Sequence, residues 1–179
     1  MNWQDLSREV ASQLSGSPAL ADERPIIYID SVQQRLYQFD IEDENLCSYP
    51  ISTAANGMGN RLDSFKTPFG THRIRQKLGG GESRGMIFVA RKPIGKIAGN
   101  LDNRDKDEIT SRILWLDGLQ EGINKGGAHD TYSRYIYIHG TSDEKRIGEP
   151  VSAGCIRMKN DDVIELFGEV LVDDIVVIR

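Results

Sequence analysis

Short hydrophobic runs separated by polar turns occupy most of this chain. They cover residues 26–29, 35–39, 47–53, 71–75, 86–90, 109–116, 134–139 and 171–178. Runs of this length, rich in Ile, Val, Tyr and Phe and bounded by Gly, Asn, Asp or Pro, are typical of strands. Because the strands follow one another without alternating helices, the pattern predicts a mainly β fold that is largely antiparallel.

Helical spacing is confined to two segments. A period of three to four residues predicts a short amphipathic helix over residues 3–14, with apolar positions at Trp3, Leu6, Val10 and Leu14. Near the other end, Asn160 precedes an acidic first turn, which predicts a capped helix over residues 160–167. Residues 15–24 are rich in Ser, Ala and Pro and form a predicted linker. We therefore divide the chain into an N-terminal helix and linker, 1–24, and one β-rich domain, 25–179.

Composition narrows the classes of function. The 179 residues include 39% hydrophobic and 27% charged residues and carry a net charge of −5, as expected for one soluble domain. Nucleic-acid binding is not expected, because it depends on an excess of Lys and Arg. No apolar run has the length of a membrane span, and the first residues do not resemble a secretory leader. A complete chain would therefore be cytoplasmic, whereas a trimmed piece could come from a periplasmic or cell-wall protein.

Two loops superficially resemble ligand-binding motifs. The glycines 79–81 lack the pattern of a phosphate-binding loop and predict a tight corner. The charged segment 100–108 lacks the glycine and the closing glutamate of a calcium loop, so we interpret it as a solvated loop.

Candidate chemistry concentrates near the C-terminus. His139 ends a predicted strand, and Cys155 follows 16 residues later in the sequence, after a turn of small residues. A cysteine becomes a strong nucleophile when a neighbouring base removes its proton, and a histidine can return that proton to a leaving amine. This spacing favours a Cys–His pair formed by loop closure.

The residues around Cys155 suggest supporting roles. Backbone amides of the Ser152–Ala153–Gly154 turn and of Cys155 are candidates for stabilising a developing oxyanion. Arg157 could bind a substrate carboxylate or anchor a loop through an ion pair, and the sequence leaves both open.

The remaining candidates have simpler interpretations. Cys47 lies in a predicted strand and is interpreted as a buried small side chain. His72 and His129 are expected to be structural or on the surface. A metal site built on His139 and Cys155 lacks further ligands at usable spacing, so no metal or other cofactor is expected.

These residues match a known pattern. The segments His139–Gly140–Thr141 and Ser152–Met158, with Asn160 and Asp161 behind them, resemble the motif of the L,D-transpeptidase catalytic domain, or YkuD-type, family. The segments 26–39, 50–53 and 66–71 also resemble the family, so the likeness covers residues 25–179.

The resemblance implies a β-sandwich or partly open barrel with small peripheral helices. It implies a thioester mechanism in which Cys155 is the nucleophile and His139 the base, with Gly154 in the oxyanion loop. Arg157, Gly140 and Thr141 become expected substrate-binding residues. The implied substrates are peptidoglycan stem tetrapeptides of muropeptides, cleaved before the terminal D-Ala, and the implied inhibitors are carbapenems that acylate the cysteine.

One departure from the family leaves the acceptor open. Ala153 stands where the family commonly has a histidine. With a cytoplasmic location, we expect an L,D-carboxypeptidase that trims or recycles murein fragments by transfer to water. The alternatives are an L,D-transpeptidase that transfers the acyl group to an amine, and a non-catalytic peptidoglycan-binding module.

Overall fold

The computed structural model describes residues 25–39, 46–99 and 107–179, together with positions 4, 7, 8, 10 and 12. The strands are β1 (Ile26–Asp30), β2 (Arg35–Phe39), β3 (Leu46–Ser52), β4 (Gly70–Leu78), β5 (Met86–Val89), β6 (Lys92–Ile97), β7 (Ile109–Gly118), β8 (Tyr137–Thr141), β9 (Ile156–Met158) and β10 (Ile175–Ile178). The helices are α2 (Asn160–Glu169) and the single 3₁₀ turns η2 (Gly127–His129) and η3 (Glu144–Arg146). The mainly β prediction is confirmed.

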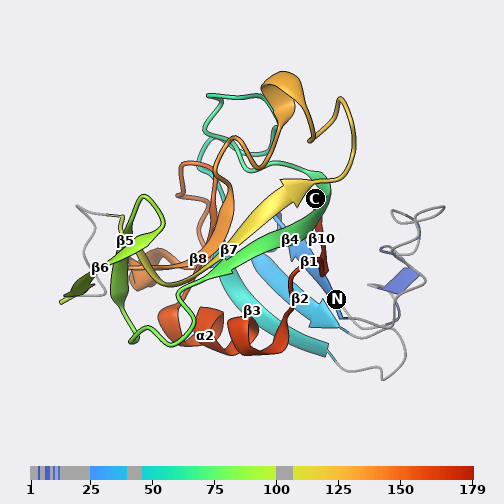
Figure 1. Cartoon of the computed structure of the whole chain (residues 1–179). Coiled ribbons are helices and arrows are strands. Elements are labelled where there is room, and N and C mark those ends of the chain that lie inside the picture. Colours follow the sequence, from blue (N-terminus) through green and yellow to red (C-terminus); the bar gives the residue numbers. More distant parts are fainter. Residues whose placement is uncertain are drawn as a thin grey trace.

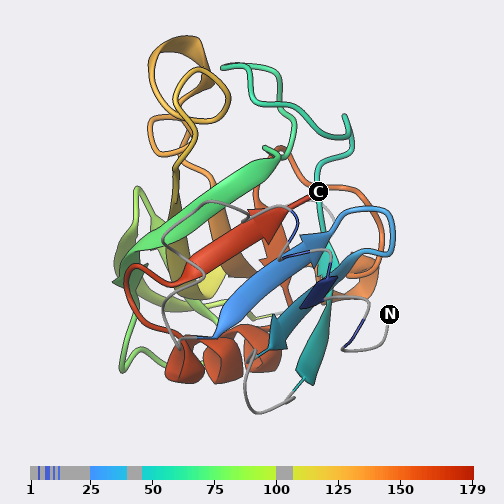
Figure 2. The same cartoon turned by 90° about the vertical axis from the view of Figure 1, so that its right-hand side faces the viewer.

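One sheet with the strand order β4-β10-β1-β2-β3-β9-β8-β7-β5-β6 forms the fold. A further pairing between β4 and β7 closes the strands from β4 to β7 into a barrel, while the β5–β6 hairpin extends beyond it (Figure 1). Helix α2 lies across one end of this barrel, away from the loops that follow β3 and β7 (Figure 2).

The sheet is largely antiparallel, as predicted, but it also contains two parallel pairs. β1 pairs with β10 in parallel, and β8 pairs with β9 in parallel. In both cases a longer connection brings the later strand back in the same direction, which a tight hairpin cannot do. The second parallel pair carries the residues singled out for chemistry.

The apolar run of β1 is buried on both faces. Ile27 and Ile29 point into the barrel core, whereas Ile26 and Tyr28 join a second cluster on the outside. Val10 covers that outer cluster and is fully buried. A strand covered on both faces needs no polar alternation, which explains its unbroken hydrophobic sequence. The described positions 4, 7, 8, 10 and 12 are helical, and the other residues of the predicted helix 3–14 lie outside the described part.

Several predicted boundaries differ from the structure. The strand predicted over 134–139 becomes β8, which starts at Tyr137, because Tyr135 has a left-handed φ of 57°, outside the extended backbone region of a regular strand. The strand predicted over 171–178 becomes β10, which starts only at Ile175. The strands β6 and β9 were not expected, since β6 is exposed throughout and β9 has three residues. Most of the charged segment 100–108 lies outside the described residues, and the glycines 79–81 lead into a turn as expected.

Asn160 does not cap its helix as predicted. The cap position of α2 is Lys159, and the backbone amide of Asn160 donates to the carboxylate of Glu144 at 2.7 Å. The Asn160 side chain instead donates to the carbonyl of Thr141 at 2.9 Å and accepts the hydroxyl of Thr110 at 2.6 Å. This buried amide ties α2 to the ends of β7 and β8.

The burial of His72 predicts acid sensitivity. Its ring is fully buried on β4, and desolvation lowers the pKa of His72 to about 4. Below its ordinary pKa near 6.5 the unfolded chain takes up a proton that the folded chain refuses, so stability falls as the pH drops from 6.5 toward 4. We expect a loss of about 3 kcal/mol in the free energy of unfolding over this window.

Urea unfolding at pH 7, 5.5 and 4 tests this expectation. A His72→Gln variant should lose much of the pH dependence, whereas a His129→Gln variant at an exposed position should keep it. An unchanged slope in His72→Gln would assign the acid sensitivity to other groups.

Candidate active site

The parallel β8–β9 ladder positions the two residues of the predicted catalytic pair. Cys155 immediately precedes β9, and its sulfur accepts the backbone amide of Tyr137 at 3.4 Å. The thiol in turn donates to the carbonyl of Tyr135 at 3.5 Å. The left-handed backbone at Tyr135 therefore lies directly beside the candidate nucleophile.

His139 lies in the middle of β8 rather than at its end, which corrects the sequence-based placement. Its side chain is buried, and Nδ1 lies 2.7 Å from the carbonyl oxygen of Gly140. Because a carbonyl can only accept, Nδ1 carries the proton and Nε2 keeps a free lone pair. A backbone carbonyl thus orients the imidazole of His139.

The strand register places both side chains on one face. His139 pairs with Arg157, and Cys155 lies two residues before Arg157. Cys155 itself lies in the bend before β9 and packs against the cluster that contains Tyr137. Tyr137 and His139 are two residues apart on β8 and share a face, so the thiol lies on the face that carries the imidazole. Their backbones are offset by roughly 7 Å along the strand and roughly 5 Å across it.

Both groups are neutral at rest. Burial raises the pKa of Cys155 to about 11, and burial also lowers the pKa of His139. A thiol with this pKa stays protonated near pH 7. A neutral thiol beside a neutral imidazole suits a mechanism in which the proton moves as the sulfur attacks.

The turn before Cys155 is held by internal hydrogen bonds. The hydroxyl of Ser152 donates to the carbonyl of Cys155 at 2.6 Å and accepts the amide of Gly154 at 3.1 Å. Gly154 has a φ of +134°, which favours glycine, and Ala153 is exposed. The amide of Gly154 is thus engaged by Ser152 instead of pointing at an oxyanion, and the amides of Ala153 and Cys155 remain candidates for that role.

Arg157 has its charge paired inside the protein. Its guanidinium forms an ion pair with Asp107, lies 3.9 Å from the carboxylate of Asp143 and donates to the carbonyl of Val151 at 3.2 Å. Only 5% of its side chain is exposed. These contacts favour the loop-anchoring alternative over the binding of a substrate carboxylate.

The contacts that the structure gives Gly140 and Thr141, the expected substrate-binding residues, lie within the protein. Both are buried. A Cβ at Gly140 would lie 2.7 Å from the carbonyl oxygen of Thr110 and 2.8 Å from Oδ1 of Asn160. The hydroxyl of Thr141 donates to Asp107 at 3.1 Å and accepts the amide of Asp143 at 3.0 Å. Neither residue presents a free group to a ligand.

A cluster of aromatic side chains beside the thiol was not predicted from the sequence. Trp115 stacks on Tyr132 with a ring-centre separation of 4.1 Å and meets Tyr137 edge-on at 5.5 Å, and Cys155 packs against this cluster. Arg91, from the turn between β5 and β6, lies 4.8 Å above the Trp115 ring. These residues come from three separate segments, so no local spacing in the sequence could reveal them.

The structure also places the remaining cysteine and histidines, Cys47, His72 and His129. Cys47 is an exposed free thiol, which corrects its predicted burial. It lies on the part of β3 that pairs only with β2, where the side chain is not covered. His72 is structural and His129 is on the surface, as predicted.

The described residues contain neither a cluster of metal ligands nor a membrane-spanning helix. In this part of the chain, no three His, Cys, Asp or Glu side chains gather closely enough to hold a metal ion. Among the same residues, no helix is both long and apolar enough to cross a lipid bilayer.

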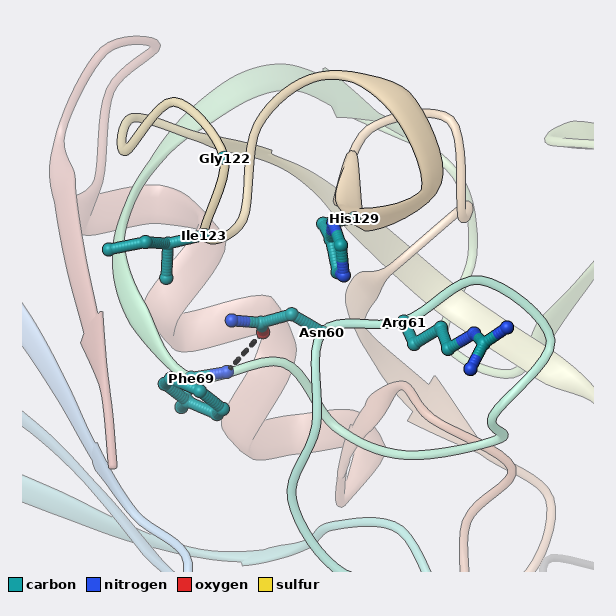
Figure 3. A pocket seen from close by; sticks show the side chains of 6 residues that line it. All are labelled: Asn60, Arg61, Phe69, Gly122, Ile123 and His129. Atoms are coloured by element: carbon teal, nitrogen blue, oxygen red, sulfur yellow. Dashed lines mark hydrogen bonds between the residues drawn. The ribbon is translucent and has the colours of Figure 1, made fainter.

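A pocket of about 470 Å³ opens between the loop after β3 and the loop after β7. Its lining residues are Asn60, Arg61, Phe69, Gly122, Ile123 and His129. The amide of Phe69 donates to the Asn60 side chain at 2.9 Å, and Arg61 extends away from the other side chains (Figure 3). The Cys–His pair does not line this pocket.

Comparisons with known proteins identify the family of this chain. The family described as the L,D-transpeptidase catalytic domain (YkuD) matches residues 24–178. YqjB of Bacillus subtilis, named as an L,D-transpeptidase, is 52% identical over 40 residues, which is 22% of this chain and 23% of that protein. The chain thus matches about a quarter of that relative's length.

Solved structures share the fold at low sequence identity. An L,D-transpeptidase from Mycobacterium smegmatis superposes with a TM-score of 0.53 and 19% identity over 87% of this chain and 58% of that one. L,D-transpeptidase 3 from Mycobacterium tuberculosis, in complex with a faropenem-derived adduct, has a TM-score of 0.53 and 16% identity over 87% and 60% of the two chains. Because the family match spans nearly the whole chain, this protein belongs to the L,D-transpeptidase catalytic domain, or YkuD, family.

Proposed function

We propose that this chain is a cysteine acyltransferase acting on peptidoglycan stem tetrapeptides, with Cys155 as the nucleophile and His139 as the base. The observation that carries the proposal is the placement of both side chains on one face of the β8–β9 ladder, with Nδ1 of His139 bonded to the carbonyl of Gly140 at 2.7 Å. Family membership supplies the substrate class.

The proposed reaction has two half-steps. Nε2 of His139 takes the thiol proton as the sulfur of Cys155 attacks the carbonyl carbon that precedes the terminal D-Ala. The C–N bond then breaks, the imidazolium returns the proton to the leaving amine, and a thioester and free D-Ala result. In the second half-step an acceptor attacks the thioester, His139 takes its proton and returns it to the sulfur, and the thiol is regenerated.

We propose water as the principal acceptor, which makes the protein an L,D-carboxypeptidase that trims or recycles muropeptides. The support is Ala153, an exposed methyl where the family commonly places a second imidazole near the acceptor. Transfer to an amine, giving a cross-link, is the competing outcome. The cytoplasmic location expected from the sequence stays a prediction.

A β-lactam should acylate the same sulfur. The related Mycobacterium tuberculosis structure contains a faropenem-derived adduct, which supports this class of inhibitor for the family fold. Carbapenem acylation of Cys155 is therefore part of the proposal.

Mass spectrometry of the purified chain with a tetrapeptide substrate tests the proposal. We expect tripeptide and free D-Ala in equal amounts, without a cross-linked dimer, and an acyl adduct on Cys155 after carbapenem treatment. Dimer as the main product would overturn the choice of water. No D-Ala release and no adduct, combined with saturable muropeptide binding, would instead identify a binding module.

A further inference from the structure

Arg134 lies next to the candidate nucleophile without an acidic partner. Its guanidinium donates to the carbonyls of Gly59 at 3.1 Å and Lys66 at 2.6 Å, with the Ser64 hydroxyl at 3.5 Å. All of these acceptors are neutral, and within the described part of the chain Arg134 forms no salt bridge. Arg157, in contrast, is paired with carboxylates. Arg134 is half-buried, and the desolvation of a cation is offset only in part by hydrogen bonds to neutral acceptors.

The contacts of Arg134 lead directly to the nucleophile turn. The Lys66 carbonyl that it binds lies 3.5 Å from the point where a Cβ on Gly154 would stand. The next residue, Thr67, donates its hydroxyl to the carbonyl of Gly154 at 3.0 Å. Arg134 also directly precedes Tyr135, whose carbonyl accepts the thiol of Cys155. One side chain thus joins both segments that border the sulfur.

We infer that Arg134 is a positioning residue for the nucleophile, holding the 59–67 loop against the Cys155 turn and supplying the positive charge that favours the sulfur when it becomes an anion. The inference rests on the proposed role of Cys155. It assigns to Arg134 a purpose that explains both its neutral partners and its burial.

The other charged groups around the sulfur define what Arg134 adds. Burial raises the pKa of the Cys155 thiol, and the carboxylate of Asp107 raises it further. The amide of Tyr137 and the guanidinium groups of Arg157 and Arg134 lower it. The imidazole of His139 on the same face is neutral, so it adds no opposing positive charge at rest. Because Arg157 is paired with Asp107, Arg134 is the unpaired positive charge among these groups.

The test is the rate of Cys155 alkylation by iodoacetamide between pH 7 and pH 10, in the full chain carrying Cys47→Ser. Below the thiol pKa the rate follows the thiolate fraction, so loss of the charge should slow labelling at every pH. We expect Arg134→Met to label about tenfold more slowly, which corresponds to a rise of about one pKa unit. Arg134→Lys, which keeps the charge but not the forked hydrogen bonds, should stay within about threefold of the parent.

Two controls separate charge from folding. Arg61→Met removes an exposed arginine of the same loop and should label at the parent rate. Thermal unfolding identifies any variant that fails to fold, and Arg134→Gln then replaces Arg134→Met. If Arg134→Lys and Arg134→Met slow Cys155 alkylation equally, the charge of Arg134 has no role and that part of the inference is wrong. If both variants are alkylated at the parent rate, the whole inference is wrong. Because labelling needs no substrate, a chain that labels as expected but releases no D-Ala would refute the proposed function and leave this inference standing.

Discussion

Cys155→Ala is expected to abolish D-Ala release from a tetrapeptide, and His139→Gln to lower kcat/KM by about a thousandfold. In the proposed mechanism, the first change removes the sulfur that forms the thioester. The second removes the base that takes its proton, a contribution of about 10²–10⁴ in comparable enzymes. Because the thiol pKa is raised to about 11, unassisted ionisation of Cys155 is negligible near pH 7. The proposed attack therefore depends on the imidazole as base. Quantifying D-Ala by chromatography gives the rates.

The matched control for this prediction is Cys47→Ser, which changes the exposed thiol and should retain full activity. The pH profile adds a second check. Since burial lowers the pKa of His139, the base stays unprotonated as the pH falls through 6.5, and the acid limb of kcat/KM should lie below that value. Activity that survives in Cys155→Ala would exclude the thioester route.

Gly140→Ala is expected to destabilise the protein by about 3 kcal/mol. The added methyl would lie 2.7 Å from a backbone oxygen of Thr110, in a ladder where the neighbouring strand cannot give way cheaply. It would also approach the Asn160 side chain, whose amide ties α2 to Thr141. Urea unfolding followed by circular dichroism measures the change.

Gly168→Ala is the matched control, because nothing lies within 4 Å of a Cβ at that helix position. It should be neutral or slightly stabilising, since alanine has the higher helix propensity. An outcome in which Gly140→Ala keeps the parent's free energy of unfolding and raises KM for the tetrapeptide would support the substrate-binding role expected from the sequence. The same outcome would contradict the structural role.

Local sequence was sufficient for the features that depend on neighbouring residues. β1, β2 and β5 follow from short apolar runs, and the helix α2 from its period and acidic first turn. The combination of a histidine with a small-residue turn and a cysteine is also local in sequence, so it indicated the family before any fold was known. The strand β9, which follows this cysteine, was not predicted because a strand of three residues has no detectable hydrophobic period.

Burial and charge at the site were not readable from sequence. Cys47 and Cys155 both lie next to β-branched or small residues, yet one is exposed and the other packs against Trp115 and Tyr137. The pKa values follow from that packing, since desolvation opposes ionisation of the thiol and protonation of the imidazole alike. Arg134 shows the same limit, because its partners come from a loop about 70 residues earlier in the chain.

The sequence by itself determined that this is a mainly β chain with one Cys–His motif, because hydrophobic periodicity and motif spacing involve residues close along the chain. Only the tertiary structure decided that β8 and β9 run in parallel, that the carbonyl of Gly140 orients His139, and that Arg134 borders Cys155. The physical reason is that strand pairing, desolvation and Coulombic contact depend on distance in space, which the order of residues does not specify.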